Sequence, residues 1–104
     1  CNPYLTFAVM LAAGLEGINK KYKLPSPVAN NIYEMSEEDR EKAGIESLPD
    51  DLFEAIKITE KSALVRKALG DKVFEYFIRN KKDEWDEYRK QVTSHELNRY
   101  LAIL

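Results

Sequence analysis

The sequence predicts an all-α chain, in which helices follow one another through short turns and no stretch forms a convincing strand. Two observations support this prediction. Apolar residues recur mostly at three- and four-residue intervals, which is the period of a helix face rather than of a strand. Residues that start or stop helices separate these periodic stretches. We therefore expect residues 1–104 to form a single helical segment.

The first predicted helix begins after Asn2, a good N-cap, with Pro3 in the position where a missing N–H costs nothing. It should run to about Lys21. From Pro3 to Leu15 the stretch carries no charge and is apolar on every face. Such a helix does not lie on the surface of a small soluble protein, and roughly 13 residues reach only about 20 Å of a ~30 Å hydrocarbon core. We expect other protein, whose segments lie upstream, to surround it.

The next helix is predicted to be short and acidic. Residues 24–27, Leu-Pro-Ser-Pro, exclude a helix, so the chain should stay extended through Tyr33. Ser36, with an aspartate three residues later, resembles a capping box and opens a helix at about 37–43. Gly44 is a suitable stop for this helix.

Three further helices are expected before residue 92. Pro49-Asp50-Asp51 opens the first, and Ser62 caps the second, which ends at Gly70. Asp71 should cap the longest helix, to about Gln91. A dense charged face of this helix should stay solvated, opposite one continuous apolar stripe. The stripe consists of Val73, Phe74, Phe77, Ile78, Trp85, Tyr88 and Val92.

The last predicted helix follows a second capping box, formed by Thr93 and Glu96. This helix should carry Leu97 and, at its end, an uncharged tail that is hard to keep in solution unless another surface covers it. The residues of this tail are Tyr100, Leu101, Ala102, Ile103 and Leu104.

Charge and cysteine content exclude several classes of function. The formal net charge of −2 gives no electrostatic reason to expect nucleic acid or an anionic membrane as a partner. Cys1 is the one cysteine, so no internal disulfide forms, and a reducing cytoplasm is the simplest setting. The chain starts with neither an initiator methionine nor a signal peptide, and Cys1 is either native sequence or an artificial boundary.

The search for catalytic groups is mostly negative. His95 is the one histidine, and a catalytic role would require an acid partner and an oxyanion hole that no motif marks. The acids at 37–39 fan out over different faces of a helix and suit its dipole better than a metal. Gly14 and Gly17 lack the strand-turn-helix setting of a phosphate loop and favour close helix packing. For Arg89 and Arg99, we expect a surface or intersubunit ion pair rather than the binding of a substrate carboxylate.

Six short stretches occur in a distinctive order and spacing. They are Asn2-Pro3-Tyr4-Leu5, residues 8–18, Asn31-Ile32-Tyr33-Glu34-Met35, Ser47-Leu48-Pro49, Ala68-Leu69-Gly70 and Glu84-Trp85-Asp86-Glu87-Tyr88-Arg89. Together they closely resemble the C-terminal region of type I glutamine synthetase, over essentially the whole chain. The resemblance implies that this chain is the helical C-terminal part of the α/β catalytic domain of that family.

The resemblance also implies an activity for the longer protein. The family makes glutamine from glutamate, ammonia and ATP through a γ-glutamyl phosphate, with Mg²⁺ or Mn²⁺, in a cytoplasmic ring of twelve subunits. Its metal-binding carboxylates, substrate-binding arginines and ATP pocket lie upstream of the segment that corresponds to Asn2-Pro3. No motif of this kind has a counterpart here, so no catalytic, cofactor-binding or metal-binding residue is carried over, and we expect the chain alone to be inactive.

The resemblance implies two structural roles and one regulatory alternative. The first helix should support the active-site sheet upstream, and the tail should contact other subunits through Tyr100, Leu101, Ile103 and Leu104, because family members insert a C-terminal helix into the facing ring. The sequence Thr93-Ser94-His95 departs from relatives, which often have a proline and an aromatic residue there.

Some bacterial members are adenylylated on a tyrosine placed like Tyr33, although the context here is more like members that lack this control. The alternative is a connector tyrosine with a packed ring.

A different class of function remains open from the residues alone. The chain is alternatively a stand-alone helical interaction module that binds a partner helix through Phe74, Phe77, Ile78 and Trp85. This alternative predicts a monomer that folds well by itself.

Overall fold

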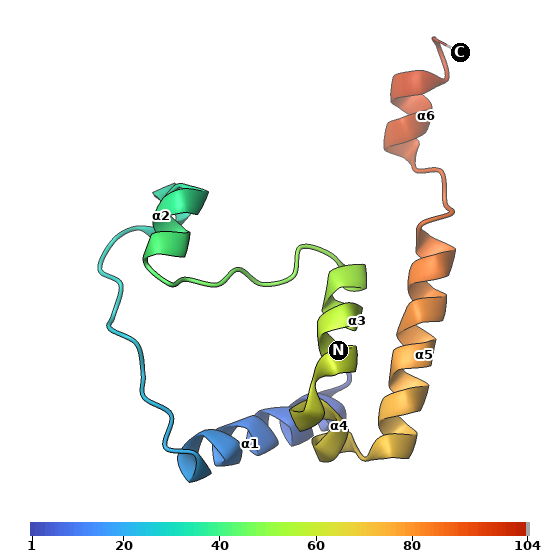
Figure 1. The fold of residues 1–104 in the computed structure, drawn as a ribbon. Coiled ribbons are helices and arrows are strands. Elements are labelled where there is room, and N and C mark those ends of the chain that lie inside the picture. The colour runs from blue at the N-terminus through green and yellow to red at the C-terminus, as the bar shows by residue number, and fades with distance from the viewer. Residues whose placement is uncertain (104) are drawn as a thin grey trace. The chain divides into compact units, whose positions relative to one another are not determined.

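The computed structural model describes residues 1–103, and every regular element within them is helical (Figure 1). The all-α prediction is therefore confirmed. The chain divides into two compact units, Cys1–Asp50 and Asp51–Leu104. The first unit contains α1 (Pro3–Asn19), the 3-10 turn η1 (Ile32–Glu34) and α2 (Glu37–Lys42). The second contains α3 (Leu52–Lys61), α4 (Ala63–Leu69), α5 (Asp71–Tyr88) and α6 (Ser94–Tyr100).

Helix α1 starts where the sequence predicted. The side-chain oxygen of Asn2 accepts hydrogen bonds from the backbone N–H groups of Tyr4, at 3.0 Å, and Leu5, at 3.3 Å. Pro3 is the first helical residue. This N-cap satisfies two of the amides that every helix start leaves without an intrahelical partner.

Helix α1 ends at Asn19 rather than at Lys21, because the chain closes there in a Schellman motif. Lys21 adopts a left-handed backbone conformation, with φ of 52°. Its N–H donates to the carbonyl of Ile18, and the N–H of Tyr22 donates to the carbonyl of Gly17, both at 3.1 Å. Left-handed φ is unfavourable for a residue with a Cβ, so this helix end is mildly strained.

No residue of α1 is buried. Five of its large apolar side chains recur every three or four residues along one stripe, and each of the five is more than half exposed. Members of the stripe are Tyr4, Phe7, Leu11, Leu15 and Ile18. We call this surface the α1 stripe.

The segment before α2 is less extended than predicted, because residues 32–34 form the turn η1. The predicted capping box of α2 forms only in part. Ser36 Oγ accepts from the N–H of Asp39 at 3.2 Å, but the Asp39 carboxylate accepts from the Ser36 hydroxyl at 2.7 Å instead of from its backbone. Aspartate is one methylene shorter than the glutamate of a complete box. Gly44, with φ of 67°, ends the helix in a Schellman turn as predicted.

The second unit has a small hydrophobic core. Helices α3 and α4 both pack on α5, and the buried residues are Ile56, Phe74 and Ile78. Near the opposite end of α5, the rings of Phe53 and Trp85 stack with centroids 5.8 Å apart. The stripe predicted on α5 is therefore covered by α3 and α4 only in part, because Val73, Tyr88 and Val92 remain 44%, 61% and 67% exposed.

Helix starts in the second unit follow the predictions with one exception. Asp51 Oδ1 accepts from the N–H of Glu54 at 2.8 Å, and Ser62 Oγ accepts from the N–H of Val65 at 3.3 Å. The prediction that Asp71 caps α5 was wrong. Gly70 occupies the N-cap position, with φ of 76° and ψ of 151°, in a region that only glycine adopts readily.

The C-terminal ends of α5 and α6 fall earlier than predicted. Helix α5 ends at Tyr88, and turns lead from there to the N-cap Thr93. The second capping box is complete: Glu96 accepts from the backbone N–H of Thr93 at 2.7 Å, and Thr93 Oγ1 accepts from the N–H of Glu96 at 3.4 Å. Helix α6 ends at Tyr100, and the described residues that follow it, 101–103, form a turn.

Candidate functional site

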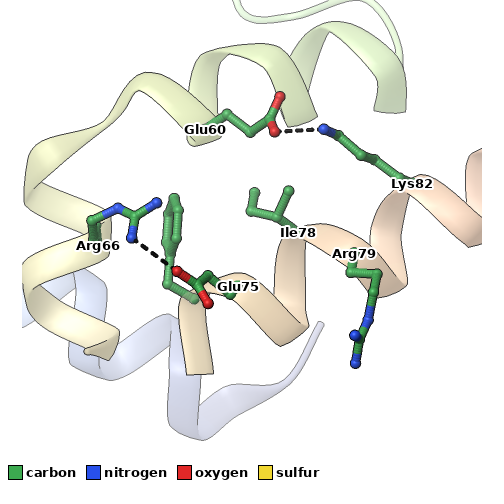
Figure 2. A pocket seen from close by; sticks show the side chains of 7 residues that line it. Glu60, Arg66, Glu75, Ile78, Arg79 and Lys82 are labelled. Carbon is green, nitrogen blue, oxygen red and sulfur yellow. Dashed lines mark hydrogen bonds and ion pairs between the residues drawn. The ribbon is translucent and has the colours of Figure 1, made fainter. Parts of the chain in front are cut away.

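A charged hollow of the second unit has a volume of about 340 Å³ and lies along α5 (Figure 2). Phe74 and Ile78 form its apolar floor. Two ion pairs flank the floor: Glu60 of α3 with Lys82 of α5 at 2.5 Å, and Arg66 of α4 with Glu75 of α5 at 3.5 Å.

Arg66 is the central cation of this hollow. Its guanidinium lies over the ring of Phe74, with Cζ 4.4 Å from the ring centroid, and its Nη1 is 2.9 Å from Asp71 Oδ1. The hydrogen bond to Asp71 raises the pKa of Arg66 above its ordinary value. Arg66 and Lys82 already face carboxylates, and the guanidinium of Arg79, which also lines the hollow, lies over the ring of Tyr76 at 4.6 Å from its centroid, so no group of cations converges to bind an anion. The cluster therefore helps to hold α3 and α4 against α5, although ion pairs this exposed contribute little to stability.

The predicted candidates on α5 and α6 lie apart from this hollow. Arg89 Nε is 2.7 Å from Asp86 Oδ1, so the ion-pair interpretation of Arg89 is confirmed. Arg99 lies beside the ring of Tyr100, at 5.9 Å from its centroid. His95 is exposed in the first turn of α6.

The acidic and glycine candidates of the first unit are also separate. The Asp39 carboxylate is occupied by the Ser36 hydroxyl, and Glu38 faces Lys42 at 4.0 Å. Within residues 1–103, no three His, Cys, Asp or Glu side chains converge as a metal site would require. A Cβ placed on Gly14 would meet no atom within 4 Å, and one on Gly17 would meet only a tyrosine ring at 3.6 Å. The close packing expected at Gly14 is thus not formed by the part of the chain that the structure describes.

Tyr33 and the described part of the C-terminal tail, residues 100–103, are both accessible. Tyr33, in η1, is 96% exposed, so its ring is not packed against this chain. Tyr100, Leu101 and Ile103 are 48%, 70% and 77% exposed, respectively. Leu104, the last of the predicted contact residues, lies outside the described residues. No helix of residues 1–103 is long and apolar enough to cross a membrane.

Comparison with known proteins decides the family. The family model described as "Glutamine synthetase, catalytic domain" matches residues 1–100. The chain belongs to this family. Its match extends over both units, from before α1 to the last residue of α6.

Relatives come from bacteria and archaea. The chain is 48% identical to the glutamine synthetases of Mycolicibacterium smegmatis and Methanococcus voltae, over 99% of its own length and 23% of theirs. It is 46% identical to that of Staphylococcus aureus, over 96% of its length and 22% of the relative. The chain thus spans less than a quarter of these glutamine synthetases.

Like the ion-pair cluster around Arg66, a second cluster of this chain was missed by sequence reasoning. A second hollow joins the start of α3 to the last turns of α5, and its lining combines three carboxylates with the rings of Trp85 and Tyr88. The carboxylates belong to Asp51, Glu84 and Glu87. The signal was present in the repeated acid-aromatic pairs Glu84-Trp85 and Glu87-Tyr88, but we had assigned the rings to the apolar stripe and the acids to the solvated face.

Proposed function

We propose that this chain is the C-terminal helical segment of a glutamine synthetase that makes glutamine from glutamate, ammonia and ATP in the cytoplasm. In this proposal the segment is structural: it supports the catalytic sheet upstream and contacts other subunits. The observation that carries the proposal is the uncovered α1 stripe. An apolar stripe in which every member is more than half exposed needs further protein to cover it.

The catalytic sheet upstream is the proposed cover of α1. Burying a large apolar side chain gains about 1.5–3 kcal/mol, so the five members of the α1 stripe are enough to hold the helix on a sheet. The uncharged stretch from Pro3 to Leu15 suits a position with protein on every side. The 23% coverage of the relatives leaves ample chain to supply that sheet.

The exposed tail is the proposed contact with other subunits, in a ring of twelve. Leu101, Ile103 and Leu104 offer neither acid, base nor metal ligand, and Tyr100 adds only a single phenol, so assembly is the role that their chemistry favours. The capping box at Thr93 fixes where α6 starts and so presents Tyr100 and Leu101 in a defined orientation.

We place ATP and Mg²⁺ or Mn²⁺ on upstream residues of the longer enzyme. The acids of this chain lie singly, in ion pairs or at helix starts, and do not converge as metal ligands do. The 104-residue chain, incubated with glutamate, ammonium, ATP and Mg²⁺, should release no phosphate. Turnover by the purified chain would contradict this assignment.

Deleting residues 101–104 from the longer enzyme tests the role of the tail. Because each large apolar side chain contributes about 1.5–3 kcal/mol when buried in a neighbour, the deletion should loosen ring-to-ring association. A single ring should keep much of its activity. As a matched control, Leu48→Ala removes another exposed leucine, in the loop before α3, and should leave assembly unchanged. A deleted enzyme that stays fully dodecameric at high dilution would refute the role.

The rival proposal, a stand-alone interaction module, loses its main support. Phe74 and Ile78, two of the four residues offered as its binding stripe, are 2% and 7% exposed, so they form the core and do not face a partner. The rival also predicts a strict monomer. Sedimentation of the 104-residue chain at tens of micromolar separates the two proposals, since the uncovered α1 stripe favours association.

Tyr33 remains a proposed modification position. Its 96% exposed ring meets the accessibility that a modifying enzyme requires. Mass spectrometry of the longer enzyme purified from nitrogen-replete and nitrogen-starved cells should show a nucleotidyl adduct on the peptide that contains Tyr33. Absence of an adduct under both conditions would leave Tyr33 as an unmodified connector residue.

A further inference from the structure

The hollow at the far end of α5 has a volume of about 510 Å³ and lies within the second unit. Asp51 and Leu52 line it from the start of α3. Glu84, Trp85, Glu87 and Tyr88 line it from the last turns of α5. Its lining contains no lysine or arginine. We call it the acidic-aromatic hollow.

One carboxylate of the hollow, that of Glu87, is placed against the usual electrostatics of a helix, whereas Asp51 caps the start of α3, where a carboxylate is favourable. The C-terminal end of a helix carries partial negative charge and normally attracts Lys or Arg. The last turn of α5 contains Glu87 and no basic residue, and the C-cap Arg89 is already paired with Asp86. Glu87 forms no ion pair with any residue of the described part of the chain, whereas Glu84 pairs with Lys81. The electrostatic field at the C-terminal end of α5 therefore favours an added cation.

The aromatic rings favour the same kind of occupant. Phe53, Trp85 and Tyr88 form a row, with neighbouring centroids 5.8 Å and 6.0 Å apart. The faces of such rings attract cations through their quadrupoles. This chain already uses the effect at one end of the row, where Lys57 Nζ lies 4.4 Å from the centroid of Phe53.

From this charge complementarity we propose that the acidic-aromatic hollow is a docking site for an arginine-bearing segment of another protein. A guanidinium stacks on an aromatic face and donates to a carboxylate at the same time, which an ammonium does less well. Trp, Tyr and Arg are also the residues that most often dominate binding energy at interfaces. The hollow is wide and open, so a side chain held by its own backbone suits it better than a free small cation.

Trp85 provides a direct test, because it is the one tryptophan of the 104-residue chain. The probe is a capped Gly-Arg-Gly-Arg-Gly peptide, titrated while the fluorescence of Trp85 is recorded. We expect a saturable change that is lost when both arginines are replaced by citrulline, which keeps the shape but not the charge. Agmatine alone should bind at least tenfold more weakly than the peptide.

Matched variants locate the binding. Glu87→Gln should weaken the peptide about tenfold, the usual effect of losing a charge-assisted hydrogen bond, and Tyr88→Leu should weaken it by removing a ring. Asp83→Asn makes the same charge change on α5 outside the lining and should alter affinity less than twofold. Circular dichroism checks that each variant keeps its helices. An unsaturable signal, equal losses in Glu87→Gln and Asp83→Asn, or agmatine binding as tightly as the peptide would each overturn the proposal.

Discussion

The two units of this chain differ in how their helices are stabilised. Helix α1 is the most apolar element, yet it has no buried residue. Helix α5 is far more charged, yet it buries Phe74 and Ile78 against α3 and α4. Apolar content therefore does not show where a core lies. What matters is whether the complementary surface belongs to the same stretch of sequence.

This contrast has a physical origin in connection length. Only Ser62 separates α3 from α4, and only Gly70 separates α4 from α5, so the three helices meet at low loop-closure cost. In contrast, twelve residues without regular structure separate Asn19 from Ile32, and η1 and α2 add only short helical turns. The first unit therefore needs a partner from elsewhere, which in our proposal is the upstream sheet.

The largest expected difference between the units comes from truncating one phenylalanine in each. Phe74→Ala removes a ring that is 2% exposed and should lower the free energy of unfolding by about 3–5 kcal/mol, enough to unfold most of the second unit. Phe7→Ala removes a ring that is 70% exposed and should change it by less than ~0.5 kcal/mol in a monomer. Urea denaturation followed by circular dichroism measures both. Equal effects would show that α1 is also buried in solution.

Association is the next expected effect. A few hundred Å² of exposed apolar surface on α1, at about 25 cal/mol per Å², supplies several kcal/mol toward self-association of the isolated chain. Phe7, Met10 and Leu11 are the residues that we expect to be buried between copies. Leu11→Glu should therefore shift the chain toward monomer in sedimentation experiments, whereas Ile58→Glu, on an exposed position of α3, should not. A strict monomer of the unmodified chain would contradict the prediction.

Local signals predicted the helices better than their ends or their packing. Caps at Asn2, Asp51, Ser62 and Thr93 were predictable because the residue and the amide that it caps lie within three positions of each other. The cap at Gly70 was missed because it depends on a backbone conformation rather than on a capping side chain. The neighbouring Asp71 is a residue type that commonly caps helices and was therefore preferred. Clusters that join α3 or α4 to α5 were missed for another reason: their members come from different helices, whose relative position no local pattern encodes.

Backbone strain provides a third comparison, with effects of opposite sign. Gly70 has φ of 76° and ψ of 151°, so Gly70→Ala should destabilise the second unit by about 1–3 kcal/mol through the backbone alone. A Cβ there would meet no other atom within 4 Å, so a steric clash would not explain the loss of stability in Gly70→Ala.

Lys21 has φ of 52°, so Lys21→Gly should stabilise the end of α1 by up to about 1 kcal/mol. Hydrogen exchange of the Tyr22 amide should slow in Lys21→Gly, and faster exchange would contradict the assigned strain.

The smallest expected effect concerns the capping box of α6, which depends on pH. The backbone N–H of Thr93, followed by its hydroxyl, donates to the Glu96 carboxylate and lowers the pKa of Glu96. Because the folded pKa is depressed, the box contributes fully above the ordinary glutamate pKa of about 4.3, and the contribution is lost as pH falls through the folded value. A carbon-detected NMR titration should show a Glu96 pKa below that ordinary value. Thr93→Ala, which removes the hydroxyl, should raise the pKa of Glu96 part of the way back and speed exchange of the first α6 amides. An ordinary Glu96 pKa in the unmodified chain would show that the capping box does not form in solution. Helix α6 would then have no fixed first residue, and the orientation of the tail that follows it would not be defined.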